Sequence, residues 1–174
     1  MSALALLRAP AAPPAAGAAL IVEALGREFA LYVGAVRSIV RVERIARAHG
    51  GPGFLLGFAN VKGQILPVIS LGRRLDPAQA GAAAASFAVV VEALGRTAAL
   101  AVDRIGAVVQ AQAADILETP ARLDASIAPF ASAVLRHDGA LAPVIDVGAL
   151  LDYPPHAAVG NARPPRAQFN GGLK

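Results

Sequence analysis

Short apolar segments separated by turn residues recur along the chain. Residues 20–22 and 29–33 are apolar and flank Leu-Gly-Arg-Glu, and residues 87–91 and 98–102 repeat this arrangement around Leu-Gly-Arg-Thr. An apolar segment on each side of a glycine-containing turn is typical of a β-hairpin. Residues 37–42 tend to alternate in polarity, which predicts a half-buried strand. Strands at such short spacing predict an all-β protein built of small barrels or sandwiches.

Two further strands are expected at residues 64–71 and 141–147, and each contains a proline, Pro67 or Pro143. Because proline has no N–H to donate to a sheet, we expect these strands at a sheet edge, at a bulge or at the rim of a barrel. Short helical turns are expected in three segments: residues 78–85, 113–117 and 147–151.

An internal repeat is the most informative feature. Residues 21–40 align without gaps to 90–109, with ten of twenty positions identical, and residues 63–76 align to 139–152 with seven of fourteen identical. The offsets are 69 and 76 residues. The matches include Gly, Pro, Glu, Arg and Asp, so the alanine-rich composition does not explain them, and they indicate a duplication. Two related modules follow, about 20–76 and 87–152, between which strands can be exchanged.

The two ends of the chain differ from its middle. Residues 1–19 and 153–174 lack hydrophobic periodicity and carry Pro-Pro pairs, so we expect flexible tails around a folded unit at 20–152. The arginine near the N-terminus follows the apolar stretch there, whereas a secretory signal has its charge first. The apolar runs are far shorter than the ~18–20 residues of a spanning helix. We therefore expect a cytoplasmic protein without direct membrane insertion.

Composition restricts the core and the chemistry. Of the 174 residues, 42 are alanine and 5% are aromatic. Alanine buries little surface, so the core is expected to come from Val, Ile, Leu and the six Phe. The absence of cysteine excludes disulfides, cysteine-ligated zinc and thiol nucleophiles.

The charge is unevenly distributed along the chain. The formal net charge is +4, but four basic residues lie in the two tails and the body is neutral. Within the body, residues 20–75 carry eight basic and three acidic side chains, and residues 76–152 carry four and nine. A dipolar body favours head-to-tail protein contacts over a phosphate backbone. The alternative is a chance asymmetry on a solvated surface.

The residues that usually carry enzyme chemistry are scattered. No metal site is expected from the three separate histidines, His49, His137 and His156. Asp146 and Asp152 correspond in the repeat to Ser70 and Asp76, which favours a role in the fold. Asp103 follows an apolar strand, where an aspartate often bonds turn amides. Phosphate-loop, nucleophile-elbow and zinc-protease motifs are absent, so neither catalysis nor a cofactor is expected.

Residues 57–71 read Gly-Phe-Ala-Asn-Val-Lys-Gly-Gln-Ile-Leu-Pro-Val-Ile-Ser-Leu. They resemble the central motif of CheW-type chemotaxis coupling domains, G-x-x-N-x-R-G-x-[IV]-x-P-[IV]-[IV]-D-L, and the resemblance extends over about 20–152. It implies two packed five-stranded SH3-like barrels with short helical turns and no catalytic activity. It also implies an adaptor that links the cytoplasmic tips of methyl-accepting chemoreceptors to the regulatory domain of a CheA-type histidine kinase, in arrays at the inner face of the membrane.

Three positions depart from the family pattern. Lys62 stands for the motif arginine and loses its planar, bidentate fork. Ser70 stands for an aspartate, which removes a charge and is expected to remove a strong hydrogen bond to backbone amides. Ser38 stands where an acidic residue is common. We expect these changes to leave the fold intact and to alter specificity for receptor and kinase.

The resemblance also implies binding residues on a strand, on the motif loop and on the second module: Val36, Ser38, Ile39, Asn60, Val61, Lys62, Gly63, Phe87 and Val108. The alternatives are that Val36, Ile39 and Val108 belong to the core and that Asn60 and Gly63 only shape a turn. The alternative function is a small β-barrel nucleic-acid-binding protein. It is supported by the basic first module, but the chain has two Tyr and no Trp for stacking on bases.

Overall fold

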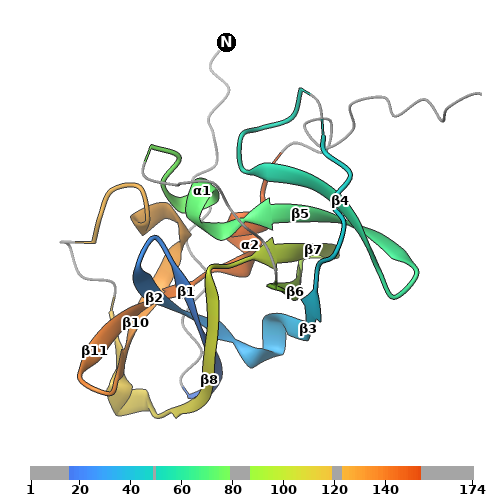
Figure 1. Ribbon diagram of the computed structural model, residues 1–174. Helices are drawn as coiled ribbons and strands as arrows, with labels where there is room; N and C mark the ends of the chain where they lie inside the picture. Colours follow the sequence, from blue (N-terminus) through green and yellow to red (C-terminus); the bar gives the residue numbers. More distant parts are fainter. Residues whose placement is uncertain (1–15, 49, 79–86, 119–122, 154–174) are drawn as a thin grey trace, which may run out of the picture.

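The structure is a computed structural model that describes residues 16–48, 50–78, 87–118 and 123–153. It is a β protein with two packed sheets and short helical segments (Figure 1). The strands are β1 (Gly17–Ala24), β2 (Arg27–Tyr32), β3 (Val36–Arg41), β4 (Leu55–Val61), β5 (Gln64–Ser70), β6 (Phe87–Ala93), β7 (Arg96–Ala101), β8 (Arg104–Ala111), β9 (Ile116–Leu117), β10 (Ala131–His137) and β11 (Ala140–Ile145). The helices are α1 (Leu71–Leu75) and α2 (Val147–Leu151), with 3-10 turns η1 (Val33–Ala35), η2 (Ala113–Asp115) and η3 (Ala128–Phe130).

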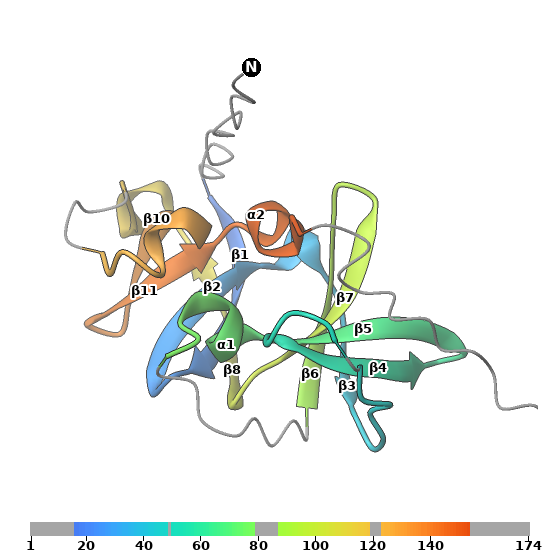
Figure 2. The same cartoon turned by 90° about the horizontal axis from the view of Figure 1, so that it is seen from above.

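The sheet order shows that the two repeats exchange hairpins. One sheet has the order β3-β6-β7-β5-β4 and the other β8-β1-β2-β11-β10-β9. By the repeat alignment, β6–β7 is the counterpart of β1–β2, and β3, β4 and β5 are the counterparts of β8, β10 and β11. Each hairpin therefore lies in the sheet built by the other module (Figure 2). The prediction of two packed barrels is confirmed, and the short β9 adds a sixth strand to one of them.

Four hairpins share one kind of two-residue turn. The first turn residue is left-handed, with φ of 57°, 51°, 55° and 46° at Leu25, Lys62, Leu94 and Asp138, and a positive-φ glycine follows each of them. Positive φ at both central residues defines the type I′ turn, whose twist matches that of paired strands. The expected turn role of Asp103 is confirmed, since the N–H of Leu25 donates to its carboxylate at 3.1 Å.

The core consists of one central cluster and two smaller ones. The central cluster draws on both sheets and contains Phe29, Leu31, Ile69 and Leu100. The other two each lie within one sheet and are rich in alanine. Twelve alanines are buried, and Phe29 is the only buried phenylalanine among the described residues. Val, Ile and Leu supply most of the core, as expected, whereas alanine contributes more to it and phenylalanine less than expected.

The two strand prolines are not on edge strands, so the edge position is excluded among the places expected for them. β5 lies between β7 and β4, and β11 lies between β2 and β10. The pairing of β5 with β7 begins at Val68, directly after Pro67, and β11 pairs with β2 at Val144, directly after Pro143. Each proline thus lies where its strand has a partner on one side only, so its missing N–H leaves no gap in the ladder.

Short helices α1 and α2 follow β5 and β11 at equivalent places in the two repeats. Their N-caps are Ser70, which accepts a hydrogen bond from Arg73 N at 3.3 Å, and Asp146, which accepts one from Ala149 N at 3.1 Å. The capping bond expected to be lost at Ser70 is therefore retained, at a greater length. Helical turns at 113–115 and 147–151 agree with expectation, whereas α1 was not anticipated.

The remaining segment boundaries need one correction. β1 begins at Gly17, inside the segment expected as an N-terminal tail. The other expected tail residues, 1–15 and 154–174, and residues 79–85 of the helical turn expected at 78–85 lie outside the described residues. Among the described helices, none is long and apolar enough to cross a membrane.

Two arginines of the five-stranded half hold the C-terminal end of α2. Arg74 lies between the rings of Phe54 and Phe130, 4.5 and 4.7 Å from their centroids. Its guanidinium donates to the carbonyls of Leu150 and Asp152 at 3.0 and 3.2 Å. These carbonyls lack hydrogen-bond partners within the helix, and the arginine supplies them. Its positive charge also interacts favourably with the negative C-terminal end of the helix dipole. Burial lowers the pKa of Arg74 from its ordinary value.

Arg96 of β7 completes this contact, since its guanidinium donates to the carbonyls of Leu151 and Tyr153 at 2.7 and 2.9 Å. Burial raises the pKa of the Tyr153 hydroxyl, and the two nearby arginines oppose that shift. The Tyr153 ring packs edge-on against Phe54 at 5.4 Å. Side chains of the five-stranded half thus hold the C-terminal end of α2, which follows the six-stranded sheet.

Replacing Arg74 with glutamine is expected to destabilise the protein by about 2 kcal/mol, because it removes charge-assisted bonds to two carbonyls and the ring contacts. Urea unfolding measures the change in the free energy of unfolding. The matched control is Arg47→Gln at an exposed arginine, where a change within about 0.5 kcal/mol is expected. Equal effects of the two variants would contradict the assigned role of Arg74.

Gly57 of the motif is required by the packing of β4 against the preceding loop. Its φ is +144°, and a Cβ built there would lie 2.1 Å from the carbonyl oxygen of Ala46. That oxygen accepts the N–H of Phe58 at 2.8 Å. The clash is with backbone, so a larger residue has to displace the bridge between Ala46 and Phe58.

Gly57→Ala is therefore expected to cost roughly 2–4 kcal/mol of folding free energy. Gly34→Ala is the control, because a Cβ there meets nothing within 4 Å. The control is expected to be neutral or to stabilise by up to about 1 kcal/mol. Thermal and urea unfolding of both variants test this, and a neutral Gly57→Ala would refute the clash.

Candidate functional site

Three of the expected binding residues are exposed apolar side chains on neighbouring strands. The exposed fractions are 49% for Ile39 on β3, 51% for Phe87 on β6 and 60% for Val108 on β8. Ile39 and Val108 are counterparts in the repeat, so both modules expose an aliphatic side chain at the same place. We call these three residues the apolar face. Their exposure excludes the alternative that Ile39 and Val108 are core residues.

The pairing of β3 with β6 sets the position of the remaining strand residues. Val36 pairs with Val91 and packs against the central core, so the core interpretation holds for that side chain in part. The register shifts between Val36 and Ser38, which leaves Arg37 as the bulged residue. The Arg37 Nε donates to Glu92 at 2.9 Å, and this hydrogen bond raises the pKa of the arginine. Ser38 is half-buried, and its side chain lies on the opposite face of β3 from that of its neighbour Ile39.

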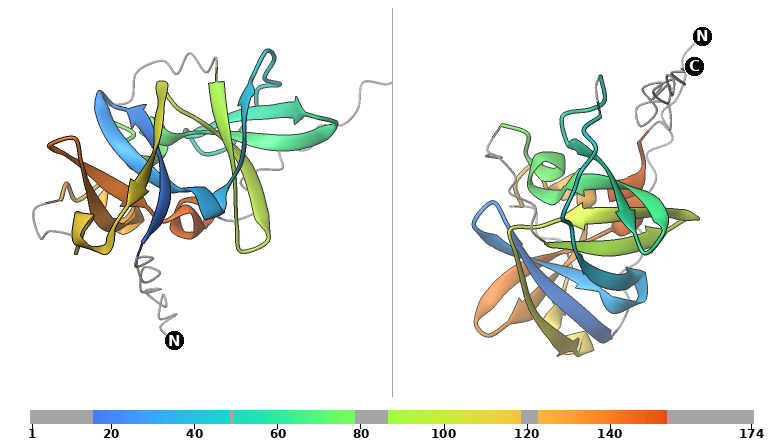
Figure 3. Two further views of the ribbon diagram at one scale, coloured as in Figure 1. Left: turned by 90° about the horizontal axis from the view of Figure 1, so that it is seen from below. Right: turned by 45° about the vertical axis from the view of Figure 1, so that its right-hand side comes forward.

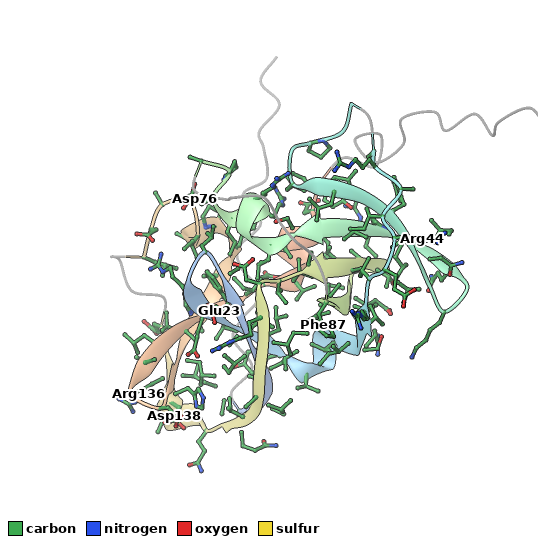
Figure 4. The ribbon with its side chains drawn as sticks, in the orientation of Figure 1. Glu23, Arg44, Asp76, Phe87, Arg136 and Asp138 are labelled. Atoms are coloured by element: carbon green, nitrogen blue, oxygen red, sulfur yellow. The ribbon has the colours of Figure 1, made fainter. Side chains whose placement is uncertain are left out.

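The strands of the apolar face are neighbours in space. β8, β6 and β3 follow one another in that order along one side of the molecule in Figures 1 and 2 and in the left view of Figure 3. Figure 4 labels Phe87 between β8 and β3. This side is thus shared by both sheets, because β8 belongs to the six-stranded sheet and the other two strands to the five-stranded one.

The other four expected residues form the tip of the β4–β5 hairpin. The side chain of Asn60 accepts a hydrogen bond from the N–H of Gly63 at 2.8 Å, so these two residues shape the turn. Lys62 is exposed at the first turn position, and Val61 is half-buried. Ile65 on the same hairpin is 64% exposed, and sequence reasoning did not single it out.

The expected residues therefore fall into two groups. The β4–β5 hairpin extends away from β8 in both Figure 1 and Figure 2. Lys62 at its tip is accordingly separate from Val108. The structure brings Ile39, Phe87 and Val108 to one side and places the four motif residues at a different part of the surface.

A cleft connects the end of β3 with this hairpin. Its volume is about 330 Å³, and its lining residues are Arg41, Val42, Glu43, Arg44, Ala59, Asn60 and Val61. Sequence reasoning did not single out Arg41 and Arg44, although both belong to the basic first module. The excess of basic residues in the first module pointed to them, but the cleft itself depends on which strands approach each other.

The unequal distribution of basic and acidic residues is still present after the two modules exchange hairpins. The segments of the five-stranded half (36–48, 50–78 and 87–101) carry eight basic and three acidic residues. The described segments of the six-stranded half (16–35, 102–118 and 123–153) carry three basic and nine acidic residues. The molecule is therefore a dipole of two oppositely charged halves, as the sequence-based charge count suggested for its two modules.

Within the described residues, no group of three or more His, Asp and Glu side chains could hold a metal ion. His137 lies 3.3 Å from the carboxylate of Asp138, and His49 and His156 lie outside the described residues. The side chains at the apolar face and the cleft are suited to binding, since they provide apolar area and charge.

Comparison with known proteins identifies the family. A model of the CheW-like domain matches residues 18–154. The chain belongs to the CheW-like domain family. The crystal structure of the scaffolding protein TtCheW from Thermoanaerobacter tengcongensis is similar, with a TM-score of 0.70 and 24% sequence identity, over 79% of this chain and 94% of that chain. This likeness supports the CheW-like fold. No curated protein matches the sequence.

The CheW-like motif places Lys62 in a conformation that lysine adopts at a cost. Its φ of 51° is left-handed, which disfavours residues other than glycine and asparagine. Lys62→Asn is therefore expected to stabilise the protein by up to about 1 kcal/mol while it removes the charge. Urea unfolding measures this, with Gln64→Asn as a control on the adjacent strand position. A destabilised Lys62→Asn would show that the lysine has a structural role.

Proposed function

We propose that this CheW-like protein is a non-catalytic adaptor, which couples the cytoplasmic tips of methyl-accepting chemoreceptors to the regulatory domain of a CheA-type histidine kinase. It would act in the cytoplasm, in arrays at the inner face of the membrane. The observation that carries the proposal is the apolar face of Ile39, Phe87 and Val108 on a CheW-like fold. Exposed aliphatic and aromatic side chains surrounded by charge are typical of a surface on which a partner helix docks.

The mechanism would be assembly. The adaptor holds receptor and kinase at a fixed geometry, and a receptor state that binds the adaptor differently shifts the kinase between active and inactive states. The rigid connection between the two halves supports this role, because Arg74 and Arg96 fix the end of α2 and the sheets share the central core. Because the halves are joined by these contacts and not by a flexible hinge, a displacement at one binding contact is transmitted to the other half.

Calorimetric titration with the regulatory domain of a histidine kinase from the same genome tests the coupling role. Low-micromolar or tighter binding is expected. In a parallel titration with a receptor-tip fragment, Val108→Glu is expected to weaken binding by about tenfold or more, because it places a charge in the apolar contact. Because the family resemblance also implies a receptor contact at the motif loop, Lys62→Glu is expected to abolish receptor binding with nearly unchanged melting temperature.

The matched control is Leu117→Glu on β9, which changes another exposed aliphatic residue, outside the apolar face. This variant is expected to bind the receptor fragment like the unchanged protein. A well-folded sample that binds no such kinase would remove the function and leave the fold. Loss of folding in Lys62→Glu would assign that residue to the structure.

The nucleic-acid alternative is supported by the eight basic residues of the five-stranded half. It is distinguished by a salt titration. Affinity for DNA or RNA that falls steeply with salt, at micromolar strength, would favour it over the adaptor.

A further inference from the structure

The two barrels differ at one place where the repeat makes them equivalent. In the six-stranded sheet, β9 pairs with β10 through Leu117 opposite Val134 and Ile116 opposite Leu135. The counterpart of Val134 in the five-stranded sheet is Phe58, which makes a single bridge to Ala46. The described residues contain no further pairing along this side of β4. The six-stranded sheet thus carries a two-residue strand here, whereas pairing along β4 stops at one bridge; we call the unpaired side of β4 beyond that bridge, at Asn60, the open seam.

Side chains reinforce this difference. Arg136 of β10 donates to the carbonyl of Ala114 at 3.1 Å and lies 3.9 Å from Asp115, so it contacts the turn η2 that precedes β9. The counterpart of Arg136 is Asn60. Its carboxamide is directed to its own turn, where it accepts the N–H of Gly63. The position that contacts η2 in one barrel is therefore used locally in the other.

The backbone of β4 presents hydrogen-bonding groups to the open seam. The N–H and C=O of Phe58 both bond to Ala46 at 2.8 Å, so they point away from β5. Successive residues of a strand face alternate edges, and the N–H and C=O of Asn60 therefore point the same way. Continued pairing would place Arg44 opposite Asn60. Instead, residues 41–44 and 59–61 line the cleft of about 330 Å³.

The charge at the seam indicates the chemistry of its occupant. Arg41 and Arg44 line the cleft and have no ion-pair partner among the described residues, and Glu43 is the one acidic residue of the lining. Figure 4 shows Arg44 at the outer side of the five-stranded half. Lys62 adds a further positive charge at the tip of the same hairpin. These side chains attract an acidic ligand.

We propose that the open seam binds an extended acidic peptide segment of a partner protein, which adds to β4 as a strand. Main-chain bonds to Asn60 would provide part of the affinity, and carboxylates facing Arg41 and Arg44 the selectivity. The C-terminal segment 154–174 of this chain does not suit the site, because it carries three basic residues and no acidic one. Arg41 pairs across the strands with Phe87, so the site adjoins the apolar face at this one position; its proposed ligand goes beyond the adaptor role.

The test uses the full chain and a short fluorescein-labelled peptide of alternating threonine and glutamate. Fluorescence anisotropy is expected to detect binding, and Arg44→Gln is expected to weaken it by about fivefold or more through the loss of a charge-assisted contact. Arg104→Gln is the matched control, since Arg104 is an exposed arginine of the other half. It is expected to leave the affinity unchanged.

A second readout separates strand addition from general charge attraction. Hydrogen exchange of the Asn60 amide, followed by NMR, is expected to slow when the peptide binds. A peptide of the same sequence that is N-methylated at every residue keeps the charge but has no N–H to donate on either edge, so it is expected not to bind. Equal binding of the N-methylated peptide, an unchanged Asn60 amide or equal effects of the two arginine variants would each overturn the proposal. Titration of the same samples with the kinase domain reports separately on the adaptor role.

Discussion

The exchange of hairpins between the two repeats is the constraint on which the structure depends. The β1–β2 hairpin completes the sheet formed by β8, β10 and β11, and β6–β7 completes the sheet formed by β3, β4 and β5. In this structure neither module forms a sheet from its own strands alone. The central core, with Phe29 from one hairpin beside Leu100 from the other, therefore forms only when the whole chain is folded. The arginines that hold the end of α2 extend the same dependence to the surface, because they join segments far apart in the sequence.

This construction also explains how one small protein presents different surfaces. Equivalent positions of the two repeats carry related but unequal residues, so duplication gives each half the same backbone and exchange places the halves side by side. Ile39 and Val108 retain a common exposed apolar character, whereas Lys62 and Asp138 occupy equivalent turns with opposite charges. The basic and acidic halves follow the same pattern. A dipolar body with an apolar face shared by both sheets is suited to holding two different partners. The open seam shows the same divergence at the level of one strand pair.

Much of the local structure could be predicted because its causes are local. The Leu-Gly turns and the apolar segments beside them fix the hairpins β1–β2 and β6–β7, and the aspartate after β7 bonds the turn amide as expected. Expectations failed where a neighbour in space decides the outcome. Pro67 is tolerated in an interior strand because the pairing of that strand with β7 begins one residue after the proline, at Val68. Alanines contribute more to the core than expected, chiefly in the cluster within each sheet. Ser70 still caps a helix because a hydroxyl reaches the same amide that a carboxylate would reach.

The same distinction, between causes local in the sequence and contacts in space, applies to the candidate site. By itself the sequence determined the family resemblance, the duplication, the hairpins and the turn formed by Asn60 and Gly63, since each depends on residues close together in the chain. Only the tertiary structure decided which strands pair, that Ile39 and Phe87 lie beside Val108, that Lys62 is separate from them, and that Arg41 and Arg44 line a cleft with Asn60. The physical reason is that these arrangements depend on contacts between distant segments. Both modules carry the same strand pattern, so the pattern by itself is compatible with each hairpin pairing in either sheet.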